Sequence, residues 1–554
     1  MDGEPIIAPF LELQQSCVGL QGYYVRLKRV RVKGPEVYKA VLTYRPRSTS
    51  SGRSQMTAVR ESKFVTLSVP NASAIEFMNS DSDQTRRILD KLAQARAADP
   101  EYKVFGASAH RYVVHAPASL DAVSRFEERV GITLPDAFRR FLLEVGCGGD
   151  GYEGSAAGPF YGVFGLESNL RSESLEWLAK VVASPCLLSP RMSIAEWEAL
   201  TGRIGIGGDA SDDQFEQTLA TLFGGILPIG SQGCSMYHGL VVTGPHTGRV
   251  VNFDQECSGP PVFAFELDFL GWYERWLDEV IDGDLFQKGP SWFGYTRGGP
   301  ESELLAGWLA ADNGLTAEEY LKGLLSKAHL SDATLDALIQ PHAREWSRRS
   351  LVCQVVCKHA PNKAQALLAE LAEHEPLAFL QCLHWYAQKQ APQWQSEVLA
   401  TTDNIGDLET FRFLTYVLEL LPIDRGSVLA PFVHHAEADF RRQALYALGK
   451  LSDRKPYLQS FVSGLGDADS TVVHAALQAL KGLTDRSLLP HYRSVAERYP
   501  VERDYVLANL DHRVKELGMT RQALLQAPVD RLEGETQGTG VWRRLGSLLG
   551  RPKQ

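Results

Sequence analysis

The residues best suited to metal chemistry lie in the C-terminal half of the chain. Cys353 and Cys357 are four positions apart on an expected helix, a spacing that puts both side chains on one helix face. Further candidate ligands follow along the chain: His359, His374, Cys382 and His384. Two helices bearing thiols and imidazoles can in principle assemble a zinc site. A Cys-x-x-x-Cys pair on an apolar face is nevertheless more typical of core packing, so we predict no metal and no cofactor.

Other catalytic signatures are weak in this sequence. Gly205, Gly207 and Ala210 match the spacing of a dinucleotide-binding loop, but residues 195–200 before them have a helical pattern, and no strand-loop-helix unit with a downstream acid is evident. A glycine loop is therefore the better interpretation. The sequence contains no Walker loop, no metalloprotease helix motif and no Gly-x-Ser-x-Gly elbow. We predict that the chain is not an enzyme.

The most distinctive stretch, residues 119–152, combines two amphipathic helices with a glycine-rich turn. Apolar residues recur at helical spacing over 120–130, behind a Ser119 cap and before Gly131. Pro135 marks the start of a second helix with a buried aromatic stripe. The turn that follows holds Gly146, Gly148, Gly149 and Gly151. This order favours a binding fold over a catalytic one.

The stretch resembles the start of the SUKH superfamily, whose pattern is a helix with a Phe-Glu pair, a glycine, a Leu-Pro helix start, an aromatic-rich helix and a glycine turn. The matching positions here are Phe126–Glu127, Gly131, Leu134–Pro135 and Phe138–Phe141. Residues 225–254 read as short strands joined by tight turns, and residues 265–281 as a closing helix, again as in the family pattern. The resemblance implies an α+β domain with a mixed sheet flanked by helices.

SUKH proteins are bacterial immunity proteins that bind and neutralise toxins, with a eukaryotic branch of regulatory scaffolds. The resemblance therefore implies an immunity protein that blocks a cognate, cytoplasm-acting protein toxin by steric occlusion. The alternative is a SUKH-type regulatory scaffold that binds several protein clients. Under both hypotheses we predict that the chain binds neither nucleic acid nor a membrane directly.

The charge of the chain is unevenly distributed. Residues 1–119 carry 17 basic and 11 acidic residues, residues 120–285 carry 10 and 25, and residues 286–554 carry 30 and 31, so the net charge of −10 comes from a balance of −15 in the central segment. An acidic field attracts basic proteins and speeds their encounter, although it also serves solubility. We therefore expect a basic toxin, either nuclease-like or another cytoplasm-acting effector. The residues predicted to face it are Asp150, Glu153, Asp209, Asp212, Asp213 and Glu216.

The N-terminal residues 1–104 are predicted to form a small, basic, strand-rich α+β module. Residues 23–34, 36–44 and 63–69 have strand patterns, and residues 81–97 have a helical one. The basic strand could hold phosphates, but it lacks interleaved aromatic residues, so we interpret it as a solvated strand face.

The predicted SUKH-like domain occupies residues 105–285, with an insert at about 167–224. A linker rich in glycine and proline follows at 286–302, and helical patterns then fill residues 303–533 before a flexible tail at 534–554.

One helical pair in that C-terminal region repeats. Gln443–Asp453 aligns with Ala475–Asp485 at an offset of 32 residues. The shared alanines would permit close helix contact and the shared leucines would fill a common core, a pattern that resembles HEAT-type repeats. We therefore predict a C-terminal α-solenoid.

Sequence features bearing on localisation favour the cytoplasm. The N-terminus lacks the basic and apolar regions of a signal peptide, and no run of about 18 apolar residues is present. Eight cysteines without a repeating framework fit reduced thiols. Cys147, Cys234 and Cys257 fall in the SUKH-like domain, where we expect them to be buried and inert.

Overall fold

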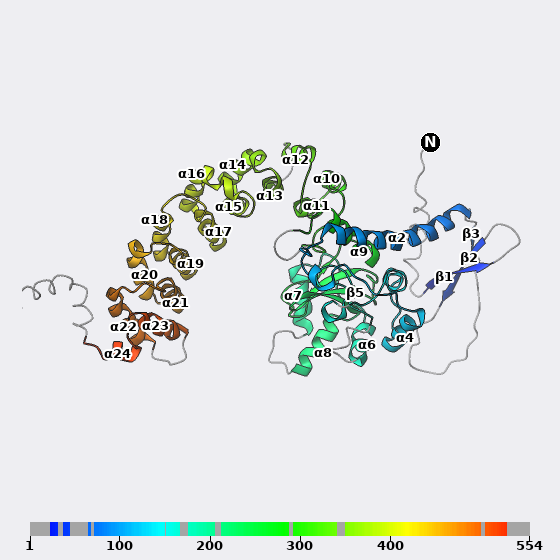
Figure 1. Ribbon diagram of the computed structural model, residues 1–554, viewed down its shortest axis with the longest axis horizontal. Helices are drawn as coiled ribbons and strands as arrows, with labels where there is room; N and C mark the ends of the chain where they lie inside the picture. Colours follow the sequence, from blue (N-terminus) through cyan, green and yellow to red (C-terminus); the bar gives the residue numbers. More distant parts are fainter. Residues whose placement is uncertain are drawn as a thin grey trace, which may run out of the picture. The chain divides into compact units, whose positions relative to one another are not determined.

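The computed structural model divides the chain into two compact units, Met1–Tyr295 and Thr296–Gln554, which are described separately (Figure 1). The structure describes residues 23–30, 37–44, 65–67, 71–149, 151–166, 175–204, 212–286, 292–340, 349–499 and 505–528. The domain boundaries expected from the sequence remain a prediction.

The N-terminal strands form a three-stranded antiparallel sheet in the order β1-β2-β3. Its strands are β1 (Tyr23–Val30), β2 (Val37–Tyr44) and β3 (Val65–Leu67), which confirms the three strands expected there. The next element, α2 (Asn71–Ala98), begins ten residues before the predicted helix. Pro70 precedes it in the sequence, and proline is favoured at helix starts.

The elements of the central region follow the order that the family resemblance implied. Its helices are α3 (Ala107–His110), α4 (Leu120–Val130), α5 (Asp136–Arg140), the π-helical turn η1 (Phe141–Val145), the 3-10 turn η2 (Tyr152–Gly154), α6 (Leu175–Ala183), α7 (Ile194–Ile204), α8 (Asp212–Leu222) and α9 (Phe269–Ile281). Its strands are β4 (Ile226–Gly233), β5 (Met236–Val241), β6 (Val250–Asp254) and β7 (Val262–Phe263).

Helix α4 forms as its sequence predicts. The Ser119 hydroxyl accepts a hydrogen bond from the backbone N–H of Ala122 at 3.1 Å, and Gly131 ends the helix at φ 75°. The Glu127 carboxylate accepts the backbone N–H of Leu134 at 2.9 Å. That hydrogen bond ties the Phe-Glu pair of one helix to the Leu-Pro start of the next.

The four strands form one sheet in the order β4-β5-β6-β7. All three pairings are antiparallel, where a mixed sheet was expected, and the α+β class is confirmed. Helix α9 supplies the largest buried side chains of the core, including Trp272, Tyr273 and Trp276. Helix α2 packs on α9, where Lys91 pairs with Glu274 at 3.0 Å. The second half of α2 therefore shares the core of the central region.

All the secondary-structure elements described in the second unit are helices. Its α-helices are α10 (Glu301–Ala310), α11 (Gly314–Ser326), α12 (Asp332–Ile339), α13 (Arg349–His359), α14 (Gln365–His374), α15 (Pro376–Trp385), α16 (Gln395–Ala400), α17 (Leu408–Leu418), α18 (Arg425–Leu429), α19 (Ala438–Gly449), α20 (Leu458–Leu465), α21 (Ser470–Ala479), α22 (Leu489–Arg498), α23 (Tyr505–Glu516) and α24 (Arg521–Gln526).

Alternate helices of this unit pack in series, α13 on α15, α15 on α17, α17 on α19, α19 on α21 and α21 on α23 (Figure 1). Ala444 and Ala476, equivalent in the repeat, are both fully buried, as the close helix contact requires. Arg441 donates two hydrogen bonds to Asp467, at 2.7 and 2.9 Å, across the turn before α21. One continuous core therefore runs through the unit, as in a solenoid.

Among the described residues, none of the helices combines the length and apolar character that crossing a bilayer requires.

A candidate protein-binding surface at the glycine turn

The six acidic residues predicted to face a partner cannot be assembled into one site from the described side chains. Asp150 and Asp209 lie outside the described residues. The other four are described in their backbone alone: Glu153 in η2, and Asp212, Asp213 and Glu216 in the first half of α8. Their role in partner binding remains a prediction.

The glycine-rich turn beside Glu153 is closed by its own backbone. Gly149 donates its N–H to the carbonyl of Gly154 at 3.0 Å, and Ser155 donates to the carbonyl of Tyr152 at 3.1 Å. The Ser155 hydroxyl donates to the carbonyl of Tyr161 at 2.6 Å. These bonds hold Tyr152 at the tip of a closed loop, where half of its surface is exposed, 50%.

The segment after the turn forms backbone hydrogen bonds with the edge of β4 that does not pair with β5. Ala156 and Val163 exchange backbone hydrogen bonds of 2.7 and 3.0 Å. Phe164 donates its N–H to the carbonyl of Ile229 at 2.8 Å, and Tyr161 donates to Ser231 at 3.2 Å. The loop is thus an extension of the sheet, and a loop carried by a rigid sheet can present side chains to a partner at low entropic cost.

Three aromatic rings gather at this loop, one of them from the segment before α3. The rings of Tyr152 and Tyr161 lie 5.4 Å apart, and the Phe105 ring lies 5.6 Å from that of Tyr161. Tyr161 also borders Gly233, the last residue of β4, and the next residue, Cys234, is exposed. We define Phe105, Tyr152, Tyr161 and Cys234 as the glycine-turn surface. Tyrosine is enriched at protein interfaces, because its ring offers a large contact area and its hydroxyl a hydrogen bond.

Two residues at this place have unfavourable backbone conformations. Phe160 and Cys234 adopt left-handed φ values of 54° and 51°. Such conformations cost free energy and persist where the surrounding structure enforces them, often at functional sites. At Gly162, with φ 98°, an added Cβ would lie 2.1 Å from the Ala156 carbonyl oxygen, so this position requires glycine.

Behind this surface lies a buried polar network. His238 Nδ1 and Asn252 Oδ1 are 2.7 Å apart, Gln232 donates to the same Asn252 oxygen at 3.0 Å, and Tyr295 donates to Gln232 at 2.8 Å. Burial lowers the pKa of His238 to about 4, so its imidazole is neutral. The rings of Phe160 and Trp272 enclose it at 5.2 and 5.1 Å. An enclosed neutral imidazole suits a structural role in this network better than proton exchange with an external substrate.

The structure brings together three of the candidate metal ligands. The sulfurs of Cys353, Cys357 and Cys382 all lie within 4.8 Å of one another, and His359, His374 and His384 are not part of that group. Of the cysteines in the central region, Cys234 is exposed and Cys147 and Cys257 are half-buried, so the expectation that all three are buried was wrong. Cys234 occupies a tight turn outside the sheet core, which local periodicity does not reveal.

Sequence reasoning missed the three rings of the glycine-turn surface. Their assembly depends on a contact between residues more than forty positions apart in the sequence, and no local pattern encodes such a contact. The signal that could have pointed to it is an aromatic residue, Tyr152, inside a glycine-rich turn, where a buried role is improbable.

Part of the chain matches a known protein family. Residues 117–269 match the SMI1 / KNR4 family (SUKH-1), a segment that includes α4, the glycine turn and all four strands of the central sheet. No curated protein and no solved structure matches the chain.

Proposed function

Because the central part of the chain is a SUKH-1 domain, we propose that this protein is a bacterial immunity protein that binds and neutralises a cognate protein toxin. The family match at residues 117–269 is the observation that carries the proposal. The toxin acts in the cytoplasm, as effectors of interbacterial competition do, and the chain blocks its active face by steric occlusion. The chain itself performs no catalysis.

The glycine-turn surface supplies the centre of the proposed contact. A stable interface buries roughly 800 Å² on each partner, and most of its binding free energy comes from a few aromatic or arginine side chains. Tyr152 and Tyr161 are tyrosines on a loop fixed by backbone hydrogen bonds, so little entropy is lost when they are covered. Asp150 and Glu153 lie two positions before and one position after Tyr152 in the sequence, and we expect their charges to contribute to partner binding.

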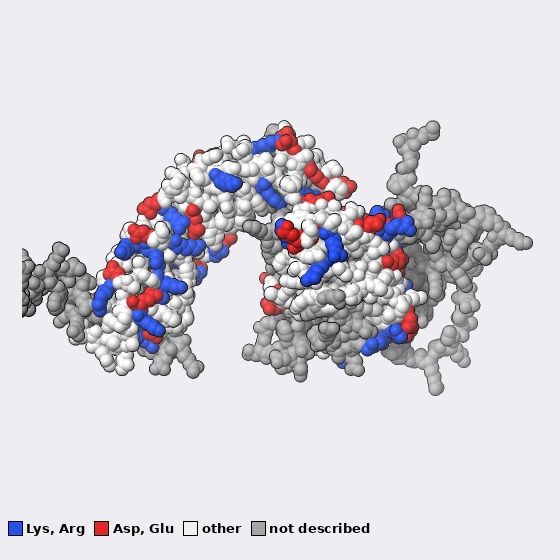
Figure 2. All heavy atoms as spheres, in the orientation of Figure 1, with Lys and Arg blue, Asp and Glu red and all other residues white. Residues whose placement is uncertain are grey.

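The charge of the central segment favours a basic toxin. Residues 120–285 hold 25 acidic and 10 basic residues, whereas residues 286–554 are nearly balanced. On the face of the helical unit in view, Lys and Arg are intermixed with Asp and Glu (Figure 2). The acidic segment would therefore steer a nuclease-like toxin toward the SUKH-1 domain, and this steering raises the association rate most at low salt.

Co-expression tests the proposal directly. The chain is produced in bacteria together with the toxin domain encoded beside its gene, and growth and co-purification are measured. We expect growth to be rescued and the two proteins to co-purify as a stoichiometric complex. A catalytically inactive toxin domain serves as the control for expression. A toxin domain that kills in the presence of the chain and does not co-purify with it would contradict the proposal.

A second candidate, a regulatory scaffold, is favoured by one feature of the helical unit. A hollow of about 350 Å³ lies between α17, α19 and α21. Its lining includes Thr415, Tyr416, Gln443, Tyr446, Lys450 and Gln478. Rings, amides and one ammonium group would suit an extended peptide of a client protein.

The variant Tyr446→Ala separates the two candidates. An immunity protein that binds through its SUKH-1 domain keeps its growth rescue in this variant. A scaffold that binds clients through the hollow would lose client binding, while Tyr152→Ala would leave that binding unchanged.

A further inference from the structure

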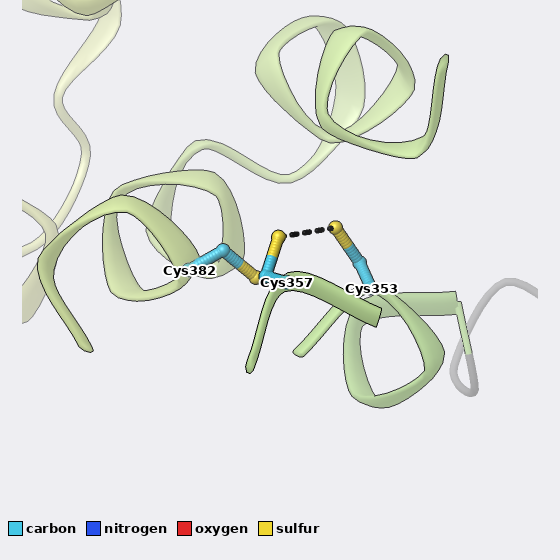
Figure 3. A group of neighbouring side chains, drawn as sticks. All are labelled: Cys353, Cys357 and Cys382. Carbon is cyan, nitrogen blue, oxygen red and sulfur yellow. Dashed lines mark hydrogen bonds between the residues drawn. The ribbon is translucent and has the colours of Figure 1, made fainter. Parts of the chain in front are cut away.

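Three cysteine side chains meet in the core of the helical unit. Cys353 and Cys357 lie one turn apart on α13, and Cys382 reaches them from α15 (Figure 3). The sulfurs of Cys353 and Cys357 are 3.8 Å apart, and all three sulfurs lie within 4.8 Å of one another. Each of the three residues is 0% exposed.

The packing of the helices explains why the three cysteine side chains lie together. Helices α13 and α15 pack against each other, and the four-residue spacing on α13 points two sulfurs at the same partner helix. The surrounding side chains are apolar and fully buried, among them Val356, Phe379 and Leu383. Aliphatic side chains would fill such a core equally well, so packing alone does not call for three sulfurs in mutual contact.

We propose that Cys353, Cys357 and Cys382 form a binding site for one thiophilic d10 metal ion, Zn²⁺ or a softer ion of the same class, held by three thiolates. Soft thiolate ligands select such ions over Mg²⁺ or Ca²⁺. Because Zn–S bonds are about 2.3 Å long, tetrahedral coordination requires sulfurs roughly 3.8 Å apart. The Cys353–Cys357 pair already has this separation. The third sulfur reaches it by a shift of no more than about 1 Å, within the range of a small side-chain adjustment.

Binding is a proton exchange with no change of oxidation state. Each thiol loses its proton to solvent as its sulfur–metal bond forms, so three protons leave for one ion bound. The affinity therefore falls as the pH is lowered. Within the described part of the chain, no histidine or carboxylate joins the group, so the protein supplies three ligands. The bound ion would link α13 to α15, two helices that α14 separates in the sequence.

The test uses the purified full chain and Cd²⁺ as the probe. Titration with Cd²⁺ should give a thiolate-to-cadmium charge-transfer band that saturates at one equivalent per chain. Mass spectrometry of protein purified without chelators should find zinc or a related ion bound. In Cys382→Ala we expect the Cd²⁺ affinity to fall about 100-fold or more, because loss of a ligand costs more than loss of a supporting contact. The matched control is Cys186→Ala, which removes a buried cysteine outside the cluster and should leave the titration unchanged.

A second variant guards against misfolding. Cys353→Ala removes a different ligand, and the helical circular dichroism signal of both variants is measured without metal. Wild-type protein with neither bound ion nor a saturable band would overturn the proposal. So would a folded cluster variant that binds Cd²⁺ as tightly as the wild type, because the thiolates that hold the ion would then lie elsewhere.

Discussion

Replacing Gly162 by alanine should destabilise the SUKH-1 domain far more than the same replacement at Gly131. Both glycines have positive φ values, 98° and 75°. The surroundings differ. An added Cβ at Gly162 would lie 2.1 Å from the Ala156 carbonyl oxygen, whereas an added Cβ at Gly131 would have no heavy atom within 4 Å. Comparing the two variants therefore separates the loss of stability caused by a steric clash from the ordinary cost of a left-handed backbone conformation at a residue with a side chain.

The expected magnitudes follow from these contacts. Alanine in the left-handed region costs about 1–2 kcal/mol, and this is the whole effect expected at Gly131. At Gly162 the clash must be relieved by moving the loop away from Ala156. That movement breaks the two backbone hydrogen bonds between Ala156 and Val163, each contributing about 1 kcal/mol. The total loss at Gly162 is about 3–4 kcal/mol.

Scanning calorimetry of the full chain measures the difference. For a domain of this size, 1 kcal/mol shifts Tm by about 2–4 °C, so Gly162→Ala should lower the Tm of the domain by roughly 6–16 °C and Gly131→Ala by roughly 2–8 °C. The Gly162 variant should also bind the toxin more weakly, because the loop that carries Tyr152 and Tyr161 moves. Equal Tm values for the two variants would refute the proposed anchoring of the loop.

Three further predictions concern charge, pH and domain structure. We predict from the sequence that Asp209, Asp212 and Asp213 are solvated; replacing them together with Asn should slow toxin association and flatten its salt dependence in stopped-flow measurements, with stability nearly unchanged, because solvated charges contribute little to folding. A wild-type rate insensitive to salt would contradict this. Burial holds the pKa of His238 at about 4 against an unfolded value of 6.5, so the unfolded chain binds the proton first, and stability is lost as the pH falls from 6.5 toward 4. Because of this histidine, the free energy of unfolding measured in urea should fall by about 2 kcal/mol between pH 7 and pH 5. In His238→Gln the free energy of unfolding should depend less steeply on pH, and the same pH dependence in the variant as in the wild type would exclude the effect. Limited proteolysis within 286–302 should release a stable C-terminal fragment that contains the helical unit. Strand content in the far-ultraviolet circular dichroism of this fragment would contradict its helical fold.

Local patterns were enough to predict much of the fold. The Ser119 cap, the Gly131 helix end and the three N-terminal strands lie where the sequence places them, because caps, glycines and alternation act over a few residues. The second central helix is less regular than its sequence suggests. Its last turn, Phe141–Val145, is π-helical, and the N–H of Gly146 donates to the Phe141 carbonyl at 3.0 Å. Its apolar stripe is compatible with either form of helix.

Features that depend on tertiary contacts could not be predicted. Cys382 is separated from Cys357 by a whole helix, so its place in the thiol cluster follows from the packing of α13 on α15 and not from spacing. The glycine-turn surface similarly needs Phe105 to approach Tyr161 from a distant segment. The family resemblance supplied what local physics could not, namely the order of elements in the central domain.

The affinity of the purified chain for its cognate toxin domain tests the central claim most directly. Biosensor measurements would compare the wild type with Tyr152→Ala, and with Leu267→Ala as a control that removes an apolar side chain, 81% exposed, outside the glycine-turn surface. We expect tight binding by the wild type and by Leu267→Ala. Loss of an interface hot spot costs about 2 kcal/mol or more, so Tyr152→Ala should bind roughly 30-fold more weakly. A toxin domain that binds Tyr152→Ala as tightly as the wild type, or binds neither, would contradict the account.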